Sequence, residues 1–218
     1  MQTISLQTMP NPAEYYGVYY PHLVNAAEIL TNYLSAFRRH CLNAQGADPI
    51  DHVLTRIKTP GSAMAKLERK HYPTDGTSAV FNIHDAIGVR IVCPMLSDID
   101  IVKRAIECIP TLEVVTEKDY IRFPKPNGYR SYHMIVRIRT ECEDRTRSTF
   151  VEIQLRTIAM DCWAALEHQL KYKRAYEGDA LIAGELRRCA DELAATDHSL
   201  LAIRENIEAS KSTCMLCS

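Results

Sequence analysis

The sequence predicts an α+β domain in which helices flank a mixed β-sheet, and three observations lead to this class. Strand-like apolar segments are interleaved with helical segments in the middle of the chain. Two strand-like segments follow each other late in the chain, as in a hairpin. Long amphipathic stripes lie near both ends. Strands that alternate with helices, together with one hairpin, favour a sheet with both parallel and antiparallel pairs.

Length and composition agree with a single globular domain. The chain has 218 residues, of which 46% are hydrophobic, and a net charge of -1. Its apolar runs are too short to cross a bilayer, and its N-terminal sequence "MQTISLQTMPNPAEYYG" lacks the regions of a secretory signal. We therefore expect a cytoplasmic protein with no membrane partner and reduced cysteines. Cys214 and Cys217 form a CxxC with no second pair, so no zinc site is expected.

Apolar stripes with helical spacing define an extension at each end of the domain. The first comprises Tyr16, Tyr20, Leu23, Ala27, Leu30, Leu34, Phe37 and Cys41 and ends before Gly46; the second comprises Ile182, Leu186, Cys189, Leu193, Leu200, Ile203 and Ile207. We expect helical extensions over about residues 13–45 and 179–210, around a core of about residues 46–176. Such regular stripes also suit pairing between subunits, so we expect a homo-oligomer.

Shorter elements are predicted between the two extensions. A basic helix is predicted from Ser62 to His71, after the turn Thr59-Pro60-Gly61 and with Ser62 as its N-cap. Further helices are predicted at Asp98 to Ile109 and Ile158 to Lys173, and strands at Ile87 to Cys93, Asp119 to Phe123, Tyr129 to Arg139 and Thr149 to Arg156.

Two of the predicted strands carry a polar face. In "STFVEIQLR", alternation places Glu152, Gln154 and Arg156 opposite the apolar Val151, Ile153 and Leu155. In "YRSYHMIVRIR", it places Ser131, His133 and Arg137 opposite the apolar set Tyr132, Met134, Val136 and Ile138. An exposed sheet face and a binding surface explain this pattern equally well.

Charged residues near these strands indicate that an anion binds there. Arg90 lies inside a predicted strand, where an unpaired charge costs several kcal/mol. Arg56 and Lys58 precede a turn, and Ser62 and Lys66 lie in the first turns of the basic helix. A helix N-terminus with converging cations attracts phosphate. The alternative is a basic helix that is simply solvated.

Two carboxylates make the hypothesis more specific. If the sheet brings Asp85 and Glu152 together, they form an oxygen site suited to Mg²⁺ with phosphates, as in phosphoryl transfer. The sequence has neither a Walker loop nor the kinase motifs. His84-Asp85 matches the HD dipeptide of one class of metal phosphohydrolase, but it enters a β-rich segment here, whereas that class places HD on a helix.

Five segments, "RIKTPGSAMAKLERK", "DAIGVRIVC", "KDYIRFPKPNGYRSYH", "VEIQLRT" and "MDCWAALEHQLKYK", lie between Arg56 and about Tyr176. In sequence and order they resemble the synthetase domain of the RelA/SpoT alarmone enzymes, and the whole chain resembles a small, single-domain alarmone synthetase. The resemblance implies a nucleotidyltransferase-like fold. It also implies Mg²⁺-dependent transfer of the β,γ-pyrophosphate of ATP to the 3′-hydroxyl of GDP or GTP, which gives AMP and ppGpp or pppGpp.

The resemblance also assigns roles to individual residues. It implies that Asp85 binds Mg²⁺ and that Glu152 completes the metal site or activates the attacking hydroxyl. Arg56 and Arg90 would stack on adenine, while Lys58, Ser62 and Lys66 would hold the ATP phosphates. The acceptor nucleotide would contact Lys118, Lys125, Tyr129, His133, Gln154 and Asp161, with guanine stacked on Tyr129. Some relatives have Arg at the position of Lys118, and small synthetases often have Asn at that of Asp161.

Several expectations about activity and partners complete the prediction. The resemblance implies a homotetramer that synthesises alarmone and does not hydrolyse it, because the hydrolase and regulatory domains of long members have no counterpart here. RNA or the alarmone itself would be the regulator. One alternative is the same chemistry on GMP or an adenine nucleotide. Another is a non-catalytic nucleotide- or RNA-binding regulator, although Asp85 and Glu152 are both present. Arg130 has no assigned role.

Overall fold

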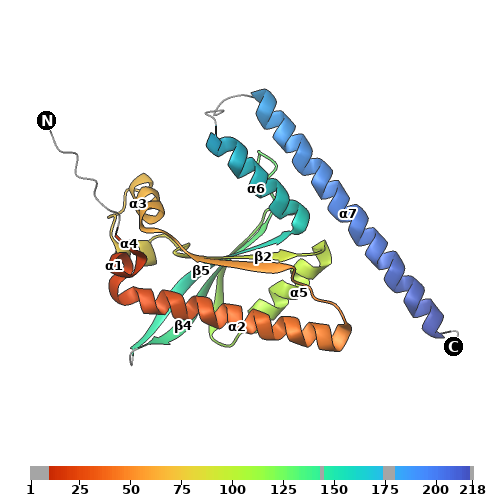
Figure 1. Cartoon of the computed structure of the whole chain (residues 1–218), viewed down its shortest axis with the longest axis horizontal. Coiled ribbons are helices and arrows are strands. Elements are labelled where there is room, and N and C mark those ends of the chain that lie inside the picture. Colours follow the sequence, from red (N-terminus) through yellow and green to blue (C-terminus); the bar gives the residue numbers. More distant parts are fainter. Residues whose placement is uncertain (1–9, 143–144, 174–179, 217–218) are drawn as a thin grey trace.

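The computed structural model describes residues 10–142, 145–173 and 180–216, which form one sheet with surrounding helices (Figure 1). The helices are α1 (Pro12–Tyr16), the 3-10 turn η1 (Gly17–Tyr19), α2 (Tyr20–Gln45), α3 (Pro60–Arg69), α4 (Gly76–Phe81), α5 (Leu96–Glu107), α6 (Ile158–Lys173) and α7 (Ala180–Leu216). The strands are β1 (His52–Ile57), β2 (Ile87–Cys93), β3 (Leu112–Asp119), β4 (Tyr132–Cys142) and β5 (Arg145–Thr157).

The sheet is mixed, as the sequence predicts. Its strand order is β1-β2-β5-β4-β3, in which β2 and β5 run parallel and the other neighbours run antiparallel. The late strands β4 and β5 form the predicted hairpin. Parallel pairing of β2 with β5 puts the segment that enters β2 beside the first half of β5. The segment that contains Asp85 therefore enters the strand next to the one that carries Glu152.

One face of the sheet is apolar and forms the core. Helices α2 and α5 cover it, and their buried side chains share one cluster with those of the strands. Leu30 of α2, Val102 of α5, Met134 of β4 and Ile153 of β5 are all fully buried in this cluster. The opposite face carries the polar residues of the same strands, because successive side chains of a strand point to opposite sides.

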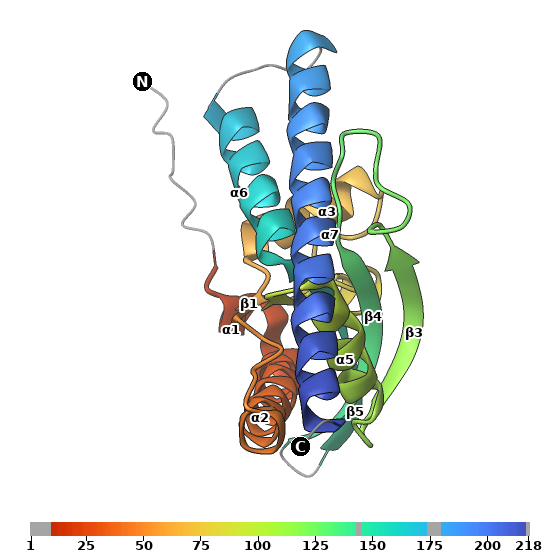
Figure 2. The ribbon, with the colours of Figure 1, turned by 90° about the vertical axis from the view of Figure 1, so that its right-hand side faces the viewer.

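The terminal helices agree with the predicted extensions. Helix α2 ends at Gly46, whose left-handed backbone (φ +68°) lets its N–H donate to the Leu42 carbonyl. Helix α7 lies beside α6 and α5 (Figures 1 and 2). The predicted stripe of α7 divides, since Ile182, Leu186 and Leu193 are partly buried while Leu200, Ile203 and Ile207 are exposed. The predicted core ends at residue 176 and the CxxC ends at residue 217. Both residues lie outside the described ranges.

Several element bounds differ from the prediction, among them those of α5 (Leu96–Glu107 instead of 98–109) and β5 (Arg145–Thr157 instead of 149–156). Helix α3 begins at Pro60, and its N-cap is Thr59 instead of Ser62; the Thr59 hydroxyl accepts from the Ser62 N–H at 3.4 Å. The strand predicted at 119–123 is wrong, because β3 ends at Asp119 and the Asp119 carboxylate accepts from two following N–H groups, which makes a turn. Strand β4 begins at Tyr132 instead of Tyr129.

Ser131 is also placed differently from the prediction, and two elements have no predicted counterpart. Ser131 is fully buried, and its hydroxyl donates to the Leu155 carbonyl instead of joining the polar face. Strand β1 and the short helix α4 are additional elements. Across the described residues, no helix is long and apolar enough to span a membrane.

Candidate active site

The polar face of the sheet holds six of the predicted site residues in two rows that cross the strands. One row joins Leu54, Arg90, Gln154, His133 and Lys118, each paired with the next on the neighbouring strand. The other joins Arg56, Gly88, Glu152 and Ile135. Directly paired residues project to the same side of a sheet. A pocket of about 200 Å³ opens between the rows and is lined by Leu54, Thr55, Arg56, Gly88, Val89, Arg90, Glu152 and Gln154.

Asp85 lies between α4 and β2 and is held by two lysines. Its Oδ2 accepts from Lys58 Nζ at 3.0 Å and from Lys66 Nζ at 2.6 Å. Burial alone would raise the pKa of Asp85, but the hydrogen bonds and charges of Lys66 and Lys58 outweigh it and lower this pKa. Its second oxygen, Oδ1, is buried and has no hydrogen-bond partner among the described residues. Asp85 is therefore an ionised carboxylate with one uncommitted oxygen.

Glu152 is ionised for a similar reason. Gln154 Nε2 donates to its Oε2 at 3.0 Å, and His133 Nδ1 lies 3.7 Å from its Oε1. Burial and the nearby charge of Asp85 each act to raise the pKa of Glu152, but His133 and Gln154 lower it overall. The charge of Asp85 therefore acts on the Glu152 carboxylate.

The donor set fits a magnesium ion that is shared with phosphates. Within the described part of the chain, no group of three or more His, Cys, Asp and Glu residues could hold a metal ion without further ligands. Mg²⁺ commonly takes only one or two carboxylates from the protein and completes its shell with water and substrate phosphates. The free Oδ1 of Asp85 and the neighbouring carboxylate of Glu152 match that pattern.

The start of helix α3 supplies an anion-binding geometry beside Asp85. Thr59 caps the helix, and its hydroxyl donates to the Ser62 Oγ at 2.9 Å. Lys58 precedes the helix and Lys66 follows Ser62 by about one turn, so both ammonium groups reach the same carboxylate. Two cations therefore meet at one carboxylate beside a helix N-terminus that carries the Ser62 hydroxyl, a combination that favours phosphate binding.

Two arginines line the other side of the pocket. Arg90, which needed an anionic partner, finds one in Asp161 of α6, with Nη1 to Oδ1 at 3.1 Å. Arg56 lies across from Gly88, where an added Cβ would stand 3.5 Å from the Arg56 Nε. Because Gly88 has no side chain, the pocket stays open beside the Arg56 guanidinium. Planar guanidinium groups at such a site can stack on an aromatic base.

The predicted acceptor residues form one hydrogen-bonded network around Tyr129. The Tyr129 hydroxyl lies 2.8 Å from His133 Nε2 and accepts from Arg156 Nη2 at 2.8 Å. Lys125 Nζ lies 4.8 Å from the centre of the Tyr129 ring. Lys118 is exposed and sits opposite His133 on β3. The structure therefore brings the predicted acceptor residues together, with Lys118 at the edge.

Arg156 belongs to this network, although the prediction gave it no site role. It is only 4% exposed and donates to Asp161 Oδ1 at 2.9 Å and to Gln154 Oε1 at 3.0 Å, besides Tyr129. The alternation that puts Arg156 on one face with Glu152 and Gln154 was the signal that could have found it. Tyr120 joins the same region, its ring centre lying 5.1 Å from that of His133; no sequence pattern singles it out.

A family model described as a region found in RelA / SpoT proteins matches residues 55–177, more than half of the chain. The chain belongs to the RelA/SpoT family. The matched region contains every predicted site residue, from Arg56 to Asp161. Membership of the RelA/SpoT family confirms the resemblance described from the sequence.

Individual RelA/SpoT proteins support the same assignment. The GTP pyrophosphokinase YwaC of Bacillus subtilis is 38% identical over 75% of this chain and 78% of its own length. The GTP pyrophosphokinase YjbM of the same organism is 33% identical over 73% of this chain and 74% of its own length. The crystal structure of the small alarmone synthetase 1 from Bacillus subtilis, bound to its product pppGpp, superposes with a TM-score of 0.81 at 30% identity. It covers 89% of this chain and 98% of that one. This likeness confirms the predicted fold class.

Proposed function

We propose that this protein is a GTP pyrophosphokinase that transfers the β,γ-pyrophosphate of ATP to the 3′-hydroxyl of GDP or GTP. The products would be AMP and ppGpp or pppGpp. The observation that carries the proposal is the pair of ionised carboxylates, Asp85 and Glu152, set among cations on the open face of the sheet. The names of its RelA/SpoT relatives and the pppGpp bound to one structural neighbour support the same chemistry.

The ATP would bind between β1, β2 and the start of α3. Lys58, Lys66 and the Ser62 hydroxyl would hold its phosphates, and the two lysines would then share their charge between Asp85 and the nucleotide. Arg56 and Arg90 would stack on the adenine from the side of the pocket above Gly88. Neutralising the triphosphate in this way makes its β-phosphorus accessible to a nucleophile.

Asp85 and Glu152 would also hold Mg²⁺, whose chemical contribution is to neutralise charge that develops on the phosphate oxygens. Asp85 offers Oδ1 for this purpose, since its Oδ2 is already committed to the lysines. The lowered pKa values of both carboxylates keep them charged throughout the neutral range.

The transfer itself would form one bond and break one bond. The 3′-oxygen of the acceptor attacks the β-phosphorus of ATP, and the bond from that phosphorus to the α,β-bridging oxygen breaks. The bridging oxygen leaves with AMP, and the proton of the 3′-hydroxyl passes to a Glu152 carboxylate oxygen. His133 and Gln154 fix the orientation of Glu152, so its carboxylate faces the acceptor side of the pocket.

The acceptor would bind on the β3–β4 side of the sheet. Its guanine would stack on the Tyr129 ring, and Lys125 and Lys118 would contact its phosphates. Asp161 lies between Arg90 and Arg156, so it would connect the donor half of the site with the acceptor half. An Asp at this position offers only acceptor oxygens when ionised, which suits the N–H donors on the edge of guanine.

The proposal is tested by incubating the purified protein with Mg²⁺, ATP and one acceptor at a time from GDP, GTP, GMP and ADP. Separation of the nucleotides should show AMP and a 3′-pyrophosphorylated guanine nucleotide in equal amounts with GDP or GTP. A folded protein that forms neither product with any acceptor would contradict the proposal. Preference for GMP or ADP would keep the chemistry and replace the acceptor. Nucleotide binding without turnover would identify a non-catalytic regulator.

The oligomeric state and location form a further part of the proposal. The exposed apolar side chains Leu200, Ile203 and Ile207 lie along one side of α7, a pattern suited to pairing with a second copy of this chain. We propose a homo-oligomer, with a tetramer favoured, that works in the cytoplasm as a synthetase without hydrolase activity. Alarmone or RNA would act as its regulator.

A further inference from the structure

The loop of residues 125–130, here called the acceptor loop, carries Lys125 and Tyr129 and is docked on the C-terminal helices. Asn127 Nδ2 donates to Glu167 Oε1 of α6 at 3.1 Å, and Arg187 Nη1 of α7 donates to the Pro126 carbonyl at 3.2 Å. Neither helix residue is among the predicted substrate contacts. The loop therefore depends on elements outside the pocket for its position.

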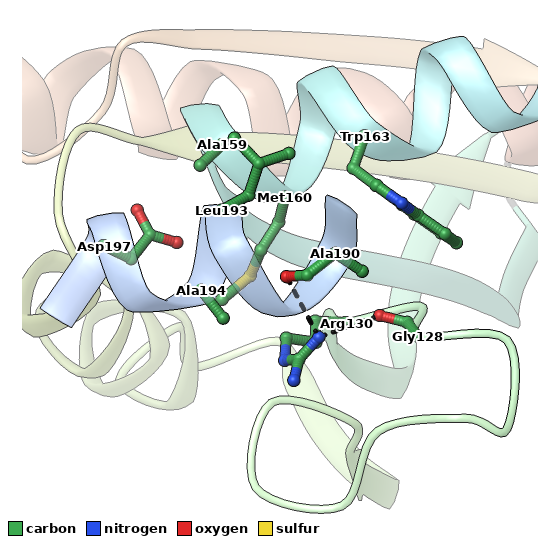
Figure 3. Close-up of a pocket in the computed structure, with 9 residues that line it drawn as sticks. All are labelled: Gly128, Arg130, Ala159, Met160, Trp163, Ala190, Leu193, Ala194 and Asp197. Carbon is green, nitrogen blue, oxygen red and sulfur yellow. Dashed lines mark hydrogen bonds between the residues drawn. The ribbon is translucent and has the colours of Figure 1, made fainter. Parts of the chain in front are cut away.

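Arg130, which had no assigned role, makes the most extensive of these contacts. Its Nη1 donates to the Gly128 carbonyl at 3.1 Å and to the Ala190 carbonyl of α7 at 3.3 Å, and its Nη2 pairs with Asp191 Oδ1 at 2.8 Å. Figure 3 shows the Arg130 guanidinium between the loop and α7. The Arg130 side chain is 16% exposed, whereas that of Asp191 is 55% exposed. The two carbonyl contacts are thus the better shielded part of this junction.

Gly128 packs closely against α7 at the same junction. Its φ of +91° suits glycine, and a Cβ added there would stand 2.7 Å from the Ala190 Cβ and 3.3 Å from the Arg187 Cα. The remaining space beside Gly128, Arg130, Ala190 and Trp163 amounts to about 10 Å³ (Figure 3). Backbone and helix are therefore in van der Waals contact, and any larger residue at position 190 must displace the loop.

We propose that Arg130 is a positioning residue for the acceptor nucleotide, which it serves by fixing the acceptor loop against α7. Tyr129 stands between Gly128 and Arg130 in the chain, so the orientation of its ring follows from how these two neighbours are held. The Tyr129 hydroxyl contacts both His133 and Arg156, and the ring must keep one orientation to make both contacts. This inference rests on the proposed function, because it assumes that Tyr129 receives the acceptor base.

Arg130 should affect the binding of the acceptor but not the binding of ATP. The hydrogen bonds and ion pair of Arg130 join Gly128, Ala190 and Asp191, whereas the proposed ATP contacts lie on β1, β2 and α3. Loss of Arg130 should therefore weaken acceptor binding and leave ATP binding unchanged. A residue with only a general structural role would change both or neither.

The first experiment measures KM for GDP and for ATP in Arg130→Ala, Arg130→Lys and the wild-type protein. Because a hydrogen bond to a charged group contributes about 1.5–3 kcal/mol, we expect Arg130→Ala to raise the GDP KM about tenfold or more. The ATP KM should stay within about twofold. Arg130→Lys keeps one charged donor and should recover part of the loss. Equal increases in both KM values, or no increase, would overturn the inference.

The second experiment perturbs the junction from the helix side. Ala190 is 4% exposed and touches the loop, whereas Ala195 on the same helix is exposed. We expect Ala190→Leu to raise the GDP KM and the matched control Ala195→Leu to leave it unchanged, because both substitutions are compatible with a helix. Equal behaviour of the two variants would contradict a role for α7.

Hydrogen exchange gives a readout that does not need activity. The Gly128 N–H donates to the Lys125 carbonyl and the Tyr129 N–H donates to Asn127 Oδ1, so both amides report whether the loop is ordered. Their exchange should accelerate in Arg130→Ala and Ala190→Leu, while that of strand β2 stays at the wild-type rate. Unchanged loop exchange would refute the docking role. If the wild-type protein made no alarmone but these amides responded, the proposed function would fail while the docking stood.

Discussion

Glu152 is held by two neighbours that are themselves on the polar face, so its removal can be tested with little structural disturbance. Replacement by Gln keeps the shape and a hydrogen-bond partner for Gln154 but cannot take up a proton. We expect Glu152→Gln to lower kcat by about 10²- to 10⁴-fold with little change in unfolding temperature. The matched control is Glu113→Gln. Glu113 is an exposed carboxylate on β3 that pairs with Arg137 of β4, and this variant should retain activity. An unchanged kcat in Glu152→Gln would remove this residue from the chemistry.

A second prediction concerns Asp85 and the pH dependence of the free energy of unfolding. The pKa of Asp85 is lower in the folded chain than in the unfolded chain, so the unfolded chain binds the proton more readily. The free energy of unfolding therefore rises with pH between these two pKa values. The contribution of Asp85 should be complete above about pH 5 and should disappear as the pH falls through the lowered pKa.

Urea unfolding at a series of pH values measures this contribution. At pH 7 we expect Asp85→Asn to lower the free energy of unfolding by about 1–2 kcal/mol, since Lys58 and Lys66 lose their carboxylate. The difference between the variant and the wild-type protein should shrink as the pH falls through the lowered pKa of Asp85. A difference that stays constant over the whole pH series would show that the charge of Asp85 is not what stabilises the fold.

How far the sequence predicts single site residues depends on their environment. Glu152, Gln154 and Arg156 were placed on one face by alternation, because the strand beneath them is regular and its other face is buried. Ser131 was misplaced, because it precedes the strand and its hydroxyl serves a backbone carbonyl. The contacts of Arg130 could not be predicted, since they join positions about 60 residues apart in the chain.

Among the elements, helix α4 offers a prediction that rests on a single glycine. A Cβ on Gly76 would stand 2.0 Å from the Tyr15 carbonyl oxygen, so α4 can lie against α1 only without a side chain there. We expect Gly76→Ala to lower the free energy of unfolding by about 3 kcal/mol, because the obstructing atom is backbone. In Gly184→Ala, the control on α7, nothing lies within 4 Å of the new Cβ. That variant should gain up to about 1 kcal/mol from helix propensity.

Both values come from urea unfolding of the full chain, monitored by circular dichroism. Equal stability of the two glycine variants would contradict the close approach of α4 to α1. The comparison isolates packing from backbone entropy, because each variant replaces a helical glycine with the same residue.

Two strands that sequence patterns missed or misplaced lack a regular alternation of buried and exposed residues. Strand β1 is an edge strand whose Leu54, Thr55 and Arg56 are all exposed, so it shows no clear alternation. Strand β3 carries an irregularity between Val114 and Thr116, which breaks the period of two. By contrast, β2 and α6 were predicted with the observed bounds, because continuous burial and a long uninterrupted helix leave strong patterns.

At the scale of the whole molecule, the exposed stripe on α7 predicts assembly. Ile203 is 54% exposed, and a charge there should be tolerated by a monomer but not at an interface between copies. We expect Ile203→Glu to lower the mass measured by light scattering, while Ala202→Glu, also exposed on α7, keeps the wild-type mass. A wild-type protein that is already monomeric, or equal masses for all three proteins, would contradict the proposed oligomer.

The strand order has a consequence for the design of ligands. Donor contacts are proposed on β1 and β2 and acceptor contacts on β4 and β3, with β5 in the centre. Arg90 on β2, which would stack on the adenine, and His133 on β4, which contacts the Tyr129 hydroxyl, are separated by two inter-strand steps of about 4.8 Å, or about 10 Å across the sheet. A bisubstrate inhibitor in which adenosine and guanosine are joined through a phosphate chain should therefore bind best when its two bases are held about that far apart. Shorter linkers would leave one base unstacked, which makes linker length a direct measure of the distance between the two halves of the site.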